Sequence, residues 1–86
     1  MRVLAYERFQ KSYQRLPGSI RRKVDKQLRL LADNLRHPSL QVKPIKGTSG
    51  VWEARVDLQY RMTFEMISDT IYLRVVGNHD DVLRRP

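Results

Sequence analysis

The 86-residue chain contains 17 lysines and arginines against 9 aspartates and glutamates, which gives it a net charge of +8. It has no cysteine, which excludes a disulfide framework and a cysteine zinc site, and its two histidines are too few and too isolated to indicate a metal site. No apolar run approaches the length of a membrane span or a signal peptide, so we expect one small cytoplasmic domain.

The positive charge is concentrated in the first half of the chain. Residues 1–46 carry twelve Lys and Arg against three acids, a balance of +9, whereas residues 47–86 carry five against six, a balance of −1. Any single charge of this kind can serve solubility alone. An excess this large in a short chain favours a polyanionic partner, with nucleic acid first, an acidic protein second and an anionic membrane surface third.

The chain begins with a predicted strand and two predicted helices. Residues 2–6 are mostly apolar or favour β-structure, which predicts a short strand. Over residues 7–16 the apolar side chains follow helical spacing, and Pro17–Gly18 breaks this helix. Ser19 is a candidate N-cap for a second helix, which we expect to end at His37–Pro38 because the residue before proline disfavours helical torsion angles. The apolar stripe of this second helix consists of Ile20, Val24, Leu28, Leu31 and Leu35.

A segment with two lysines leads into the second half of the chain. Pro44 excludes a long central strand between residues 40 and 50, so we expect a short edge strand or an extended loop. This segment would carry Lys43 and Lys46 to the margin of a sheet. Either lysine alone can be a solubilising residue.

Three runs of alternating hydrophobicity predict an antiparallel meander. Residues 51–56, 60–66 and 70–76 place apolar side chains at every second position, which is the period of a strand with one buried face. Packing the helical stripes onto that face gives a two-layer α+β domain in the order β-α-α-β-β-β. Its predicted core consists of Val24, Leu28, Leu31, Trp52, Met62, Phe64 and Leu73.

The first turn of the meander brings two arginines together. If Val56 pairs with Tyr60, Arg55 and Arg61 lie near each other on the polar face of the sheet. Glu53 lies two residues before Arg55 and therefore faces the same side.

The second turn sets the faces of the last strand. A two-residue turn at Ser68–Asp69 is expected to pair Thr63 with Arg74. Strict alternation then keeps Arg74 on the polar face and Val75 on the apolar face. The segment after residue 77 is polar, and we interpret Arg84 and Arg85 as part of a mobile tail.

Four sequence elements follow one another in an order that resembles a known family. They are Lys-Pro-Ile-Lys-Gly at 43–47, Gly-Val-Trp-Glu-Ala-Arg-Val at 50–56, Gln-Tyr-Arg-Met-Thr-Phe at 59–64 and Val-Val-Gly-Asn-His-Asp at 75–80. With the basic two-helix start, they resemble the RelE/ParE toxin superfamily of bacterial and archaeal toxin–antitoxin systems over nearly the whole chain. The resemblance implies that residues 1–86 form a single RelE-like toxin domain.

This resemblance implies a type II toxin that is neutralised by a cognate antitoxin protein. The superfamily contains ribosome-dependent mRNA endonucleases of the RelE type and gyrase poisons of the ParE type. We expect the RelE type, in which the 2′-hydroxyl of ribosome-bound mRNA attacks the adjacent phosphate without a metal or other cofactor. A gyrase-inhibiting toxin and a catalytically degenerate toxin that acts as a protein-binding module are the alternative hypotheses.

The resemblance also implies catalytic roles for three residues, and side-chain chemistry adds a fourth. Arg55 falls on a strand position that is basic in RelE and Arg61 on the arginine of the Tyr-Arg motif, so both would stabilise phosphoryl charge. His79 falls near a C-terminal position occupied by Arg or His, and its side chain is suited to moving a proton near neutral pH. Glu53 is the candidate for a second proton carrier.

Three further residues are candidates for binding RNA phosphates. Lys43 and Lys46 lie in the loop where relatives carry phosphate-binding or acid-base residues, and Arg74 adds a third cation. The chain departs from RelE in two places, with Glu53 in place of a second basic residue and Leu83 in place of a tyrosine. A different acid-base pair and a loss of cleavage are both compatible with these departures.

Each catalytic candidate also has a purely structural interpretation. Glu53 and Arg55 can form a solvated pair on the sheet surface, and Arg61 can bridge to a neighbouring acid. His79, which precedes two aspartates, can be a salt-linked cap.

Overall fold

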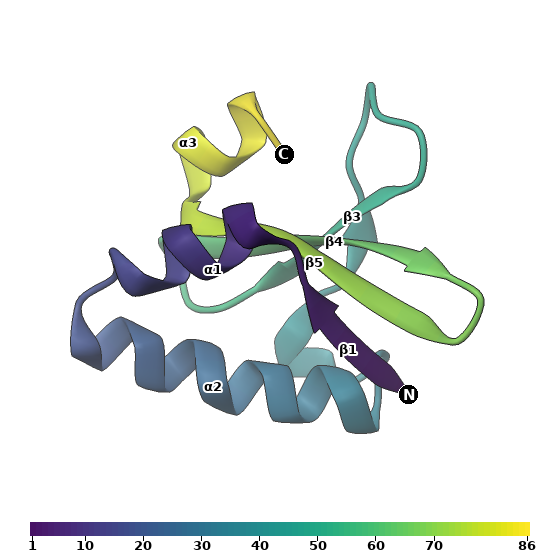
Figure 1. The fold of residues 1–86 in the computed structure, drawn as a ribbon, viewed down its shortest axis with the longest axis horizontal. Helices are drawn as coiled ribbons and strands as arrows, with labels where there is room; N and C mark the ends of the chain where they lie inside the picture. Colours follow the sequence, from purple (N-terminus) through teal and green to yellow (C-terminus); the bar gives the residue numbers. More distant parts are fainter.

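One mixed sheet is covered by two helices on one face and by a third, short helix on the other. The computed structural model describes residues 1–86 (Figure 1). Its elements are β1 (Arg2–Ala5), α1 (Glu7–Gln14), α2 (Gly18–Asp33), the 3₁₀ turn η1 (Pro38–Leu40), β2 (Lys43–Pro44), β3 (Val51–Arg55), β4 (Tyr60–Ile67), β5 (Thr70–Asn78) and α3 (His79–Arg84). None of the helices combines the length and the apolar character that a membrane crossing needs. The predicted α+β fold is confirmed.

The sheet has the strand order β1–β5–β4–β3–β2. The antiparallel meander β3–β4–β5 is present as predicted, and β1 joins its edge parallel to β5. The short strand predicted around Pro44 is β2, which pairs with β3 at the opposite edge, where the missing N–H of proline is tolerated.

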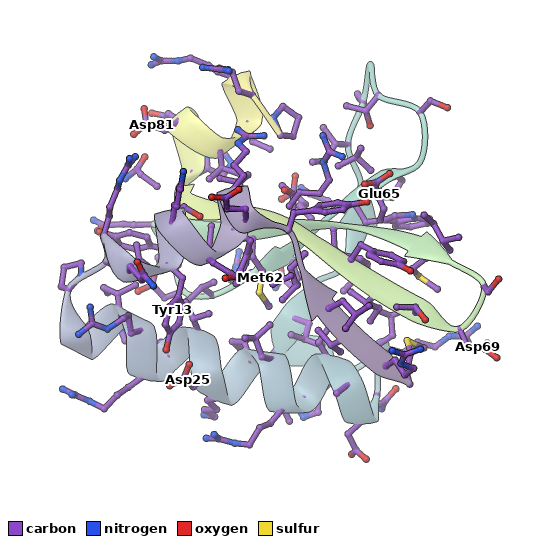
Figure 2. All side chains as sticks on the ribbon, viewed as in Figure 1. Tyr13, Asp25, Met62, Glu65, Asp69 and Asp81 are labelled. Carbon is purple, nitrogen blue, oxygen red and sulfur yellow. The ribbon has the colours of Figure 1, made fainter.

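The core lies between the sheet and the helices α1 and α2. Five of the seven predicted core residues belong to it, and Leu28 and Trp52 are partly buried against it. In Figure 2, Met62 lies between the sheet and α2, and Tyr13 and Asp25 face each other between the two helices. The Tyr13 hydroxyl donates to the Asp25 carboxylate at 2.6 Å, which joins α1 to α2. The buried cluster consists of Phe9, Leu16, Val24, Leu31, Leu40, Ala54, Val56, Met62, Phe64, Ile71, Leu73 and Val76.

Both predicted ends of α2 are wrong. The helix begins two residues earlier than a Ser19 cap would require, with Pro17 at the N-cap position and no side-chain cap. Because Pro17 is already extended, with ψ of 150°, its carbonyl can accept the first helical N–H groups, and Ser19 falls inside the first turn. The helix ends before His37–Pro38, since Asn34 is extended with φ of −151° and ψ of 98°.

A β-bulge changes the expected register of the second hairpin. Phe64 pairs with Leu73, which fits the expected register, but Thr63 pairs with Val75 and not with Arg74. The register shifts at the Thr63–Phe64 step, and Arg74 is the extra residue on β5. A bulge reverses the alternation beyond it, so Val76 joins the core in the place expected for Val75.

The segment predicted as a mobile tail is a helix. The Asn78 side chain caps α3 by accepting the N–H of Asp80 at 3.1 Å, and acidic residues occupy the first turn, where they complement the helix dipole. Val82 is buried against β5, and a Cβ on Gly77 would lie 3.3 Å from its Cγ2. Tertiary packing therefore orders a segment too short to show a helical pattern in the sequence.

Candidate functional site

Two arginines form a cross-strand pair on the face of the sheet that α1 and α2 leave free. Arg55 of β3 lies opposite Arg61 of β4, as the first turn predicts. The Val56 N–H donates to the Tyr60 carbonyl at 3.0 Å and closes the turn that sets this register. The next row across the same face contains Lys43, Glu53, Thr63 and Val75.

Arg61 is held in place by contacts on two sides. Its Nη1 donates to the carbonyls of Asp57 at 2.6 Å and Tyr60 at 3.0 Å. Its Nε lies 3.7 Å from Glu53 Oε1, and the side chains of Arg61 and Glu53 are only 11% and 6% exposed. Glu53 is therefore a buried partner of Arg61, and the predicted solvated pair with Arg55 is wrong.

Arg55 is less constrained than Arg61. The side chain is half-buried, forms no ion pair, and its Nε is buried without a hydrogen-bond partner. Its backbone carbonyl accepts from Gln27 Nε2 at 2.9 Å, which ties β3 to α2. A half-buried guanidinium without an ion-pair partner, next to a second arginine, is suited to binding an anion.

His79 is fixed to the same end of the sheet as the arginine pair. It is the first residue of α3, and its N–H donates to the Gln59 carbonyl at 2.7 Å. The imidazole is 42% exposed, and Nδ1 lies 3.2 Å from Asp80 Oδ1. The predicted salt link to an aspartate is present, although it lies at the start of a helix, and the exposed ring remains available to a ligand.

The three predicted phosphate-binding residues are not gathered in one place. Lys43 is exposed and lies opposite Glu53 at the edge of the polar face, whereas Lys46 is exposed in the loop between β2 and β3. Arg74 lies on the polar face but is engaged, because its Nη1 is 2.8 Å from Glu65 Oε1 and its Nε donates to the Pro86 backbone oxygen at 3.0 Å. Figure 2 shows Glu65 on the α3 side of the sheet.

Asp57 organises the turn beside the arginine pair. Its carboxylate accepts the N–H groups of Gln59 at 2.8 Å and Tyr60 at 2.9 Å and pairs with the Lys23 ammonium at 3.1 Å. Partial burial acts to raise the pKa of this carboxyl, but the hydrogen bonds from Gln59, Lys23 and Tyr60 outweigh it and hold the pKa below its ordinary value.

Two residues that support the site do not stand out from the sequence. In the sequence, Asp57 has the properties of an ordinary turn residue. Gln27 has those of an ordinary polar residue in a helix. Gln27 has one detectable signal: it lies three residues after Val24 and four before Leu31, on the apolar stripe of α2, where it is 5% exposed. A lone amide on a buried stripe indicates a specific hydrogen-bond partner.

The fold defines the class of the protein. No protein-family model and no curated protein sequence matches the chain. Solved structures with the same fold are toxins of the RelE/ParE superfamily, which confirms the predicted resemblance.

Three of these structures illustrate the match. A chain of the RelB–RelE antitoxin–toxin complex from Methanococcus jannaschii has a TM-score of 0.75 and 26% identity, with 96% of this chain and 99% of that chain covered. The YoeB/ParE toxin from Agrobacterium tumefaciens has a TM-score of 0.75 and 16% identity over 92% and 99%. A chain of the intact E. coli RelBE complex has a TM-score of 0.71 and 18% identity over 90% and 94%.

Proposed function

We propose that the protein is the toxin of a type II toxin–antitoxin system and that it cleaves mRNA on the ribosome. The observation that carries the proposal is the Arg55–Arg61 pair on the polar face of the sheet. Arg61 is fixed by backbone carbonyls, and Arg55 has no ion-pair partner. The fold, shared with RelE at 26% identity, supports the same assignment.

The two arginines would stabilise the phosphorane that forms when the 2′-hydroxyl attacks the adjacent phosphorus. In this step the O2′–P bond forms and the P–O5′ bond breaks, so the negative charge on the non-bridging oxygens increases. Arg61 is preorganised to meet that charge by its contacts to turn carbonyls, and Arg55 adds a second guanidinium that no carboxylate neutralises. A preorganised donor of this kind contributes about 3 kcal/mol to the transition state.

Proton transfer is assigned to His79. A base must take the proton of the 2′-hydroxyl and an acid must supply one to the leaving 5′-oxygen. His79 is exposed beside the arginine pair and can serve in one of these steps. Glu53, the other predicted proton carrier, is buried against Arg61, which favours a role in positioning that arginine.

We further propose a cognate antitoxin as the protein partner. RelE occurs with RelB in the two complexes described above. An antitoxin segment rich in acidic residues would complement the net charge of +8 and mask the cationic surface.

Translation of a reporter mRNA with the purified protein, followed by mapping of 5′ ends, tests the proposal. We expect ribosome-dependent cuts that Arg61→Ala slows by about 10²- to 10³-fold. Arg22→Ala removes an exposed arginine of α2 and should cut like the wild type. The proposal is wrong if no cuts appear, or if Arg61→Ala arrests growth as strongly as the wild type does.

A second candidate function is inhibition of gyrase. It follows from the resemblance to the RelE/ParE superfamily, which also contains gyrase poisons, and the YoeB/ParE toxin shares the fold with a TM-score of 0.75. This function requires no proton transfer. Inhibition of DNA supercoiling that persists unchanged in His79→Ala would therefore select it over the nuclease.

A further inference from the structure

A cleft of about 700 Å³ lies between α1 and α3, and neither Arg55 nor Arg61 lines it. Four cationic side chains line it, against two acidic ones. Glu7 is already paired with Lys11 at 3.3 Å, whereas none of the three arginines forms an ion pair with a carboxylate. The charged residues of the cleft are Glu7, Arg8, Lys11, Arg15, Asp81 and Arg85.

The cleft is partly apolar as well as cationic. Leu16, Val75, Val76 and Val82 contribute to its lining. The bulge in β5 turns Val75 to the polar face of the sheet, where it adds to this apolar lining. A ligand that fits combines anionic groups with flat or apolar ones.

The positive charge of the cleft extends to Arg74 on the polar face of the sheet. Partial burial, and after it the positive charges of Arg85 and Arg74, lower the pKa of the Arg8 guanidinium from its ordinary value. Arg8 donates to the Arg85 carbonyl, and Arg74 donates to the next backbone oxygen, that of Pro86. Three arginines thus meet where the polar face joins the cleft, and only Arg74 has a carboxylate partner.

We propose that this cleft is a second RNA subsite, which holds the single strand as it continues from the arginine pair. The inference rests on the proposed function for the origin of that strand. The four cationic side chains of the cleft, which we call the rim cations, bind successive backbone phosphates. The valines that line the cleft contact the sugars and base edges. Single-stranded RNA offers both kinds of group at regular spacing, which matches the mixed lining of the cleft.

Binding of RNA that cannot be cut tests the subsite separately from catalysis. The probes are labelled 2′-O-methyl oligoribonucleotides, a trinucleotide that spans only the polar face and a nonanucleotide that also reaches the cleft. Lys11→Gln/Arg15→Gln removes two rim cations of α1 with a residue that favours helix. Arg22→Gln/Lys26→Gln removes the same charge from the exposed face of α2 and is the matched control.

We expect the rim variant to bind the nonanucleotide roughly tenfold more weakly and the trinucleotide as the wild type does. Loss of two phosphate contacts should also lower the slope of log affinity against log salt by about 1.4, at ~0.7 for each contact to a single strand. The control variant should keep the wild-type affinity and slope for both probes.

Three results with the RNA probes would overturn the subsite. The first is an equal loss of RNA affinity in the rim variant and the control variant. The second is an equal loss of affinity for the trinucleotide and the nonanucleotide. The third is a wild-type affinity that does not rise with probe length. An acidic peptide that loses affinity in the rim variant while RNA does not would also overturn it, because it assigns the cleft to a protein partner. Loss of reporter cleavage with length-dependent binding intact would contradict the proposed nuclease and leave the subsite standing.

Discussion

Two ion pairs on the polar face, one in each hairpin, differ in how deeply they are buried, and the shorter pair is the more exposed one. Glu65–Arg74 across β4–β5 is the shorter at 2.8 Å, but its side chains are 26% and 31% exposed. Glu53–Arg61 across β3–β4 measures 3.7 Å, with side chains 6% and 11% exposed. Because a charge left alone in a buried site is poorly solvated, the longer pair matters more for stability and for holding an arginine in one position.

Breaking each pair in turn should give the largest difference. Glu53→Gln leaves the buried Arg61 charge uncompensated and should lower the free energy of unfolding by about 3 kcal/mol. Glu65→Gln breaks a partly solvated pair and should lower it by less than about 1 kcal/mol. Chemical denaturation at neutral pH measures both. Equal losses in the two variants would mean that burial does not distinguish the pairs.

The two hairpins also differ in the regularity of their register, which two valines test. Val76→Thr buries a hydroxyl in the core and should lower the free energy of unfolding by about 2 kcal/mol. Val75 is 9% exposed and lines the cleft, so the hydroxyl of Val75→Thr lies nearer to solvent and should lower it by less, about 1 kcal/mol. The same denaturation experiment measures both. A larger loss in Val75→Thr would restore the strict alternation predicted from the sequence.

The same contrast explains how much of the molecule could be predicted. The pairing of Arg55 with Arg61 follows from alternation and a short turn, because both act within a few residues of each other. The bulge at Arg74 does not follow from the sequence. The same strand residues are compatible with a regular register and with a bulged one. The burial of Glu53 was also missed, because its residue type indicates exposure unless its partner is known.

The C-terminal region shows a further limit of prediction from sequence. α3 has six residues, too few for a repeating apolar stripe, and it depends on Val82 packing against β5. His79 could be proposed as a proton carrier from its chemistry alone. Its position beside the arginines depends on a backbone hydrogen bond to Gln59, which the sequence does not encode locally.

The turns of the two hairpins give the smallest expected difference, and it depends on pH. Asp57 accepts two backbone N–H groups and a lysine in the first turn, whereas Asp69 in the second turn is exposed and its carboxylate forms no hydrogen bond or ion pair. Asp57→Asn should lower the free energy of unfolding by about 1 kcal/mol at neutral pH through weaker hydrogen bonds. Asp69→Asn, the matched control, should leave it unchanged.

Acid should remove the Asp57 effect. The pKa of this carboxyl is lower in the folded protein than its ordinary value, so its stabilisation is complete above about pH 4 to 5 and is lost as the pH falls through the folded pKa. The difference between the wild type and Asp57→Asn in denaturation experiments should therefore shrink below about pH 4. A difference that grows with acid would mean that burial, which raises the pKa, outweighs the hydrogen bonds. Because the Asp57 and Tyr60 carbonyls of this turn hold Arg61, loss of the carboxylate charge should also loosen the arginine assigned to the phosphate.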